Sequence, residues 1–258
     1  MEIQLIPLEK FQSFLLCLLR VAALVSSMPV IGSRQVPIQF KVGLTGGITI
    51  LLFPLMEPLT PALNLTLPGF GFLVVNEVLL GLLLGLSAQL IFTAVELGGN
   101  VIGIKMGFAA ANVFDPQSQQ QVALVSRFQS LLAMLIFLAL DGHHIFLRLI
   151  VKSYAILPPG QLSFSGASAG YLVELTGKMF VLGVQFAAPV LAILIITSMV
   201  LGVMARVFPQ LNVFMLSFPV NIGVAFLVIG LTLNLSVLLL RREFDFLGQR
   251  LLTFFNLL

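Results

Sequence analysis

Residues 179–205 read MFVLGVQFAAPVLAILIITSMVLGVMA, a stretch without a single Asp, Glu, Lys or Arg. A helix needs roughly 20 apolar residues to cross the ~30 Å hydrocarbon core of a bilayer, and this stretch is longer than that. After Arg206, residues 207–240 are again free of these charged residue types. Two such runs in succession predict an α-helical integral membrane protein.

The composition of the whole chain points the same way. Of its 258 residues, 59% are hydrophobic and 9% are charged, whereas a soluble domain has about 25% charged residues. So few charges cannot cover the surface of a water-soluble fold, and a soluble protein is excluded. The net charge of +3 is scattered along the chain. Nucleic-acid binding, which needs clustered Lys and Arg, is therefore not predicted.

Four further hydrophobic segments precede residue 179, one free of charge and three interrupted by Arg, Gly or Pro: residues 11–31, 42–56, 78–95 and 122–147. We therefore expect an all-α, polytopic membrane protein with about six hydrophobic helical segments. Residues 1–258 are expected to form a single membrane domain. Basic residues divide almost evenly between alternating loops, which leaves the orientation open and argues against a simple up-and-down bundle.

Residues 241–258 mix charged residues with Phe and Leu. This pattern predicts an amphipathic C-terminal tail that lies in the membrane interface. Docking of the tail on a partner subunit is the alternative.

The segment at residues 98–121 is rich in glycine, small residues and uncharged amides. Irregular backbone is not tolerated against lipid, so such a segment lies outside the membrane, inside protein or along a water-filled cavity. Its Met106, Phe108 and Phe114 are suited to closing a pore, and its glutamines to lining one. On the residues alone, an ordinary surface loop is the favoured interpretation.

Charged residues inside predicted spans are candidates for function. Arg20 and Glu77 are the clearest, and an ion pair between helices, or contact with polar groups of partner subunits, is the structural alternative. Asn212, Asn221 and Asn234 are suited to hydrogen bonds between helices. A proton-coupled transporter would bury several acids near the midplane, and this sequence offers few.

The sequence Asp141-Gly142-His143-His144 suggests a metal site or a proton relay. Neighbouring residues of a helix point about 100° apart, however, and adjacent histidines rarely bind one ion together. A polar break in a helix is the favoured interpretation. Phosphate-binding, zinc-protease and serine-hydrolase motifs are absent from the sequence, so no enzyme activity, metal or cofactor is predicted. Gly81 and Gly85 fit the small-xxx-small pattern of close helix packing.

Several of these segments together resemble one family. Residues 205–212, Ala-Arg-Val-Phe-Pro-Gln-Leu-Asn, are similar to the Arg-x-x-Pro-Gln-Leu-Asn segment of the FliR family of flagellar export-gate subunits, whose injectisome relatives are the SctT proteins. Met106-Gly107-Phe108 with Asp115-Pro116 resembles the central region of the family, and the resemblance covers nearly the whole chain. One departure is local: the family often has a glycine soon after the Asp-Pro pair, where residues 117–121 read QSQQQ.

The resemblance implies a non-enzymatic subunit of an export gate in the bacterial inner membrane, at the flagellar basal body. It implies assembly with FliP and FliQ, association with FlhB and FlhA, and contact with lipid. It also implies a non-bundle, helical-hairpin arrangement within the gate, whose central channel carries unfolded flagellar subunits. It also implies that the loop within residues 98–121 plugs the idle channel. The alternatives are an injectisome subunit of the SctT type, a small-solute secondary transporter, and a membrane enzyme that uses His143 and His144.

Two sets of residues follow from this resemblance. The expected plug residues are Met106, Gly107, Phe108, Asn112, Phe114, Asp115, Pro116, Gln117, Gln119, Gln120 and Gln121. The residues of the family segment, expected to pack between subunits, are Arg206, Pro209, Gln210 and Asn212.

Overall fold

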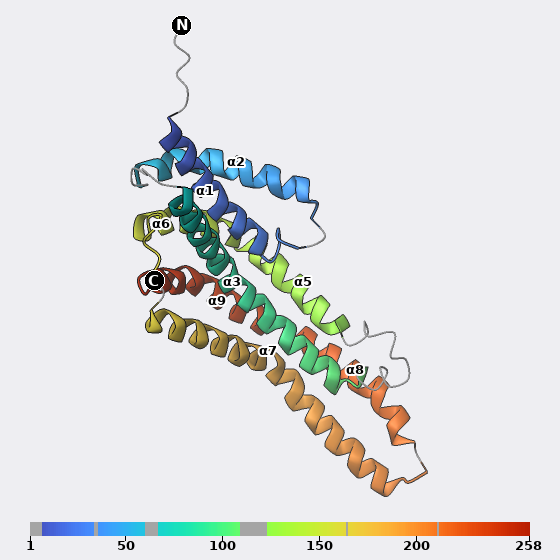
Figure 1. Ribbon diagram of the computed structural model, residues 1–258. Helices are drawn as coiled ribbons and strands as arrows, with labels where there is room; N and C mark the ends of the chain where they lie inside the picture. Colours follow the sequence, from blue (N-terminus) through green and yellow to red (C-terminus); the bar gives the residue numbers. More distant parts are fainter. Residues whose placement is uncertain (1–6, 34–35, 60–66, 109–122, 164, 211) are drawn as a thin grey trace. The chain divides into compact units, whose positions relative to one another are not determined.

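The computed structural model describes residues 7–33, 36–59, 67–108, 123–163, 165–210 and 212–258. Helices make up its regular structure, and the described residues contain no strand (Figure 1), so the all-α prediction is confirmed. The elements are α1 (Leu8–Ser27), α2 (Ile38–Met56), the short 3-10 helix η1 (Glu57–Leu59), α3 (Leu67–Lys105), α5 (Ala123–Ala139), α6 (Gly142–Ile156), α7 (Gly166–Val207), α8 (Val213–Leu231) and α9 (Leu233–Phe255).

Most of these helices are suited to a bilayer. Five of the described helices are long and apolar enough to cross a membrane, and the count rises to 6 if α5 and α6 form one broken span. The prediction of about six hydrophobic helical segments is therefore confirmed.

The structure moves the boundaries of two predicted segments. Residues 98–105, which the sequence placed in the loop, form the last turns of α3. The long run at residues 207–240 is not one span, because α7 ends at Val207, α8 occupies its middle, and α9 begins at Leu233. The break after α7 is explained by Pro209, since the residue before a proline is disfavoured in helical conformation.

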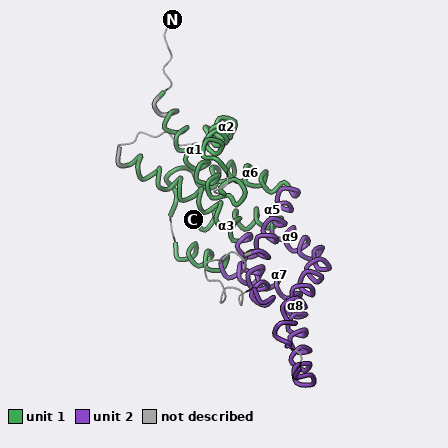
Figure 2. Tube along the Cα trace, turned by 90° about the vertical axis from the view of Figure 1, so that its right-hand side faces the viewer, with its two compact units in different colours: residues 1–90, 141–175, 244–258 green, residues 91–140, 176–243 purple. Residues whose placement is uncertain are grey.

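The chain forms two compact units (Figure 2). The first comprises residues 1–90, 141–175 and 244–258, and the second comprises residues 91–140 and 176–243. Three helices, α3, α7 and α9, contribute residues to both units, and the remaining boundary falls at the break between α5 and α6.

In the first unit, α1 lies beside α2 and α3 (Figure 1). The approach to α3 is close enough to require glycine. A Cβ added at Gly81 would collide with the carbonyl oxygen of Arg20, and one added at Gly85 would collide with the hydroxyl of Ser27. The predicted small-residue packing is therefore confirmed, with α1 as the partner helix.

The C-terminal part of α9 also belongs to the first unit. Its apolar residues Phe244, Leu247, Leu251 and Phe254 are all buried. Leu258 is also held by hydrogen bonds. The N–H and the hydroxyl of Ser163 donate to its carbonyl oxygen at 3.0 and 2.7 Å. These four side chains are covered by the chain itself, whereas Phe246 is exposed, and the position of the tail relative to the membrane stays a prediction.

The second unit is built around one apolar cluster. Its buried members are Ile102, Met106, Val125, Ala187, Val190, Leu194, Ala225, Val228 and Ile229. Glycines again allow the helices to approach, since a Cβ added at Gly98 would lie 2.9 Å from the carbonyl oxygen of Gly183 in α7. A Cβ at Gly99 would collide with the backbone of Ser126 in α5. The last turns of α3 are packed into this cluster through Ile102.

Candidate functional site

Arg20 is the charged residue that the sequence placed inside the first span, and it is fully buried in the first unit. It lies on the face of α1 that also buries Ser13, Leu16, Cys17 and Leu24, and this spacing of three and four residues keeps all of them on one side of the helix. A charge buried on that face requires a partner.

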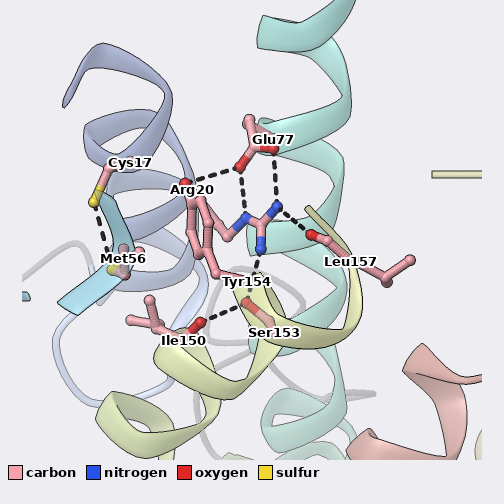
Figure 3. A network of polar contacts seen from close by, with 8 residues as sticks. All are labelled: Cys17, Arg20, Met56, Glu77, Ile150, Ser153, Tyr154 and Leu157. Atoms are coloured by element: carbon pink, nitrogen blue, oxygen red, sulfur yellow. Dashed lines mark hydrogen bonds and ion pairs between the residues drawn. The ribbon is translucent and has the colours of Figure 1, made fainter. Parts of the chain in front are cut away.

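The partner is Glu77 of α3 (Figure 3). Arg20 Nε donates to Glu77 Oε2 at 2.5 Å and Arg20 Nη2 donates to Oε1 at 2.9 Å. Both side chains are 0% exposed. The predicted ion pair between helices is therefore confirmed, and its two-point geometry is the strong form of this interaction.

Residues at the end of α6 complete the network (Figure 3). Arg20 Nη1 donates to the Ser153 hydroxyl at 2.9 Å, and Nη2 donates to the carbonyl oxygen of Leu157 at 3.1 Å. The Tyr154 hydroxyl donates to Glu77 Oε2 at 3.2 Å, and the Tyr154 ring centroid lies 3.8 Å from Arg20 Cζ. Both charges are therefore satisfied within the unit, and the network joins α1, α3 and α6.

Part of this network was not predicted from the sequence. Tyr154 carried a usable signal, because a buried tyrosine normally needs a partner for its hydroxyl. The carbonyl of Leu157 carried none, because it becomes available only where α6 ends.

Only the first part of the expected plug lies within the described residues. Met106 is 0% exposed and belongs to the apolar cluster of the second unit, and Phe108 packs against that cluster. Gly107 between them has a φ of 97°, the left-handed conformation that favours glycine. The remaining plug residues lie outside the described residues: Asn112, Phe114, Asp115, Pro116, Gln117, Gln119, Gln120 and Gln121.

The described residues of the family segment lie at the end of α7 and just before α8. Arg206, Pro209 and Gln210 are exposed there. Asn212 is the N-cap of α8, and its side-chain oxygen accepts a hydrogen bond from the N–H of Met215 at 3.3 Å. The predicted hydrogen bond from Asn212 to another helix is therefore replaced by a local cap. Packing of this segment between subunits stays a prediction.

Asp141, His143 and His144 lie where the helix breaks, as the favoured interpretation predicted. Asp141 has a left-handed backbone with a φ of 53° and precedes α6. One ligand atom from each of the three residues falls within 4.8 Å of the others, and His144 Nδ1 lies 3.5 Å from Asp141 Oδ1. One fact weighs against a cation: the three residues lie at the N-terminus of α6, where the helix dipole places its positive end.

We therefore expect the purified protein to carry no stoichiometric zinc. Elemental analysis after metal loading and desalting would check this, with His144→Asn as the comparison. Equal and sub-stoichiometric zinc in both proteins is the expected result. Stoichiometric zinc that disappears in His144→Asn would show instead that the three side chains hold an ion.

A pocket lies within the second unit. Its wall comes from α3, α5, α7, α8 and α9, and its lining residues are Val95, Gln129, Leu132, Ile136, Phe186, Ile229, Leu233, Ser236, Val237 and Leu240. None of these residues carries a charge. A proton-coupled transporter needs titratable groups at its substrate site, so this pocket does not favour the transporter alternative.

Comparison with known proteins gives a consistent result. Residues 11–247 match the family described as bacterial export proteins, family 1. The chain is similar to the flagellar biosynthetic protein FliR of Pectobacterium carotovorum, with 35% identity covering 84% of this chain and 82% of that protein. It is 31% identical to FliR of Bacillus subtilis, with 92% of each chain covered. It is 33% identical to FliR of Escherichia coli, with 80% of this chain and 78% of that protein covered.

Proposed function

This chain belongs to the FliR family, within family 1 of the bacterial export proteins, and we propose on that premise that it is a non-catalytic subunit of the flagellar protein-export gate. The match over residues 11–247 carries this proposal. In this role the chain lies in the bacterial inner membrane and forms part of a channel for unfolded flagellar subunits. Its partners are FliP and FliQ, with FlhB and FlhA associated.

The exposed surface of the described helices supports an assembled role. Large apolar side chains stand exposed on α2, α7 and α8, among them Leu51 at 76%, Met199 at 68% and Leu231 at 77%. Apolar patches of this extent need lipid or protein to cover them. Co-purification in mild detergent, followed by mass spectrometry, would identify the covering subunits, and recovery of the chain without FliP and FliQ would contradict the proposed assembly.

The loop after Phe108 closes the channel in this proposal. A conduit wide enough for an unfolded chain leaks ions unless apolar side chains exclude water from its narrowest part. Residues 109–121 supply Phe114 and a run of glutamines for that purpose. Because Met106 is buried in the second unit and Phe108 packs against the same cluster, any test of the loop must leave these two residues in place.

Deleting residues 109–121 is therefore expected to raise ion leakage through the assembled complex several-fold while leaving the complex intact. Conductance of the complex in planar bilayers measures the leak, and size-exclusion chromatography measures assembly. Replacing the same residues with an equally long Gly-Ser sequence separates side chains from chain length, and we expect this variant to leak too. A deletion variant that assembles and stays as tight as the wild-type complex would end the sealing role.

A further inference from the structure

The outward side of α6 carries two positive charges. Arg148 and Lys152 are both exposed, and their spacing of four residues places them on the same side of the helix. Ala155, one turn further on, is exposed on that side too. Because α6 contains no Asp or Glu, Arg148 and Lys152 form a basic face. The opposite side of the helix is buried and comprises Phe146, Leu149, Ile150, Ser153 and Tyr154.

The chain itself does not neutralise this basic face. Within the residues that the structure describes, neither Arg148 nor Lys152 has a hydrogen-bond or ion-pair partner. The acid nearest to them in sequence is Asp141, which lies 3.5 Å from His144. Lys41 of the same unit, by contrast, donates to two backbone carbonyl oxygens at 2.9 Å. The two cations of α6 are therefore available to a negatively charged group outside the chain.

The connection to α5 places the basic face at the boundary of the bilayer. Only Leu140 and Asp141 separate α6 from α5, whose single charge, Arg127, lies near its beginning. α6 itself has 15 residues and a length of ~22 Å, which is too short to cross the hydrocarbon core. Charges within that core face a protein interior or a water-filled cavity, whereas Arg148 and Lys152 lie on the open side of the helix. α6 is therefore not the second half of a broken span, and its basic face belongs at the level of the headgroups.

We propose that the basic face of α6 binds the anionic phospholipid headgroups of the membrane. Phosphate oxygens accept charge-assisted hydrogen bonds from the guanidinium of Arg148 and the ammonium of Lys152. Two such cations at an anionic surface correspond to roughly a 30-fold preference over neutral headgroups. The boundary position of α6 favours lipid over the acidic surface of a partner protein. The proposal requires a membrane protein but not the export role, so either can fail without the other.

The test uses the complete complex in nanodiscs and a fluorophore on the basic face. Ala155→Cys supplies one exposed thiol on that face, while the native Cys17 is buried. The nanodiscs contain phosphatidylcholine and a minor, constant fraction of a quenching lipid with brominated acyl chains. This lipid is either phosphatidylglycerol, which is anionic, or phosphatidylcholine. We expect the anionic lipid to quench several times more strongly, because the basic face gathers it around the fluorophore.

Three double variants assign the effect to these two charges. Arg148→Gln/Lys152→Gln should assemble normally and lower quenching by the anionic lipid to the level of the neutral one. Arg148→Lys/Lys152→Arg retains both charges and should retain the preference. Lys105→Gln/Arg127→Gln is the matched control, because it removes the same two residue types from exposed positions of the second unit. This control should leave the preference unchanged.

Equal quenching by the two brominated lipids in the wild-type complex would overturn the recognition of anionic headgroups. An equal loss of preference in Lys105→Gln/Arg127→Gln would overturn its assignment to α6. Quenching by neither lipid would place the basic face away from the membrane and overturn the proposal outright. In that case, loss of a subunit from the Arg148→Gln/Lys152→Gln complex would identify an acidic protein surface as its partner.

Discussion

Glu77→Ala is expected to destabilise the chain by about 3–5 kcal/mol, the usual cost of removing one partner from a buried ion pair. The substitution leaves the Arg20 guanidinium 0% exposed without its counter-charge, and it removes the acceptor of the Tyr154 hydroxyl. Because the network joins three helices of the first unit, we expect far less assembled complex to accumulate. Thermal unfolding of the purified complex in detergent gives the size of the loss.

The double variant Arg20→Met/Glu77→Met provides the control. It replaces both charges with apolar side chains of similar length, which often costs little or even stabilises a protein. We expect it to recover most of the stability that Glu77→Ala loses. If the single variant unfolds at the wild-type temperature, the pair contributes no stability. If the double variant is stable but export fails, the charges themselves have a role in transport.

Gly81→Ala is expected to cost about 1–3 kcal/mol, the range for overpacking a close contact. The added methyl group would collide with the carbonyl oxygen of Arg20 and lie 2.6 Å from the Cβ of Ala23. Backbone atoms cannot rotate away as side chains do, so α1 has to move from α3. That movement also pulls Arg20 from Glu77, and the loss should therefore lie at the upper end of the range. The melting temperature of the complex measures it.

Gly43→Ala is the matched substitution for this prediction. Gly43 lies in α2 and has no atom within 4 Å of an added Cβ. In a helix, alanine is favoured over glycine by about 1 kcal/mol, so the complex should keep or slightly raise its melting temperature. Equal destabilisation by the two substitutions would argue that glycine flexibility, and not the approach of α1 to α3, is what matters at position 81.

Hydropathy alone predicted the helical class and the number of apolar segments, because the thickness of a bilayer imposes a minimum length on each span. The end of α3 was misplaced for a physical reason. Gly98 and Gly99 predicted a loop, but in the structure they permit contact of α3 with Gly183 and Ser126. Glycine marks both turns and close helix approaches, and only the neighbouring helices distinguish the two.

The sequence predicted which two charged residues form the buried ion pair, but not the other residues that contact them. Arg20 and Glu77 stood out as charges within apolar runs, and mutual pairing was the simplest way to satisfy both. Ser153 and Leu157 could not be assigned to them, because their polar atoms reach Arg20 only through the packing of α6. The burial of Phe244 and Leu247 in the tail was likewise not predictable, since an amphipathic pattern does not reveal whether lipid or protein covers its apolar face.

The first unit has a consequence for the biogenesis of the protein. It draws residues 1–90 and residues 244–258 into one compact body, and on the ribosome the latter emerge after every residue of the second unit. The helices within residues 1–90 are therefore only partly packed while the rest of the polypeptide is translated and inserted. Until residues 244–258 have emerged, the first unit is incomplete, and its unpacked surfaces are accessible to chaperones, to the insertion machinery and to proteases.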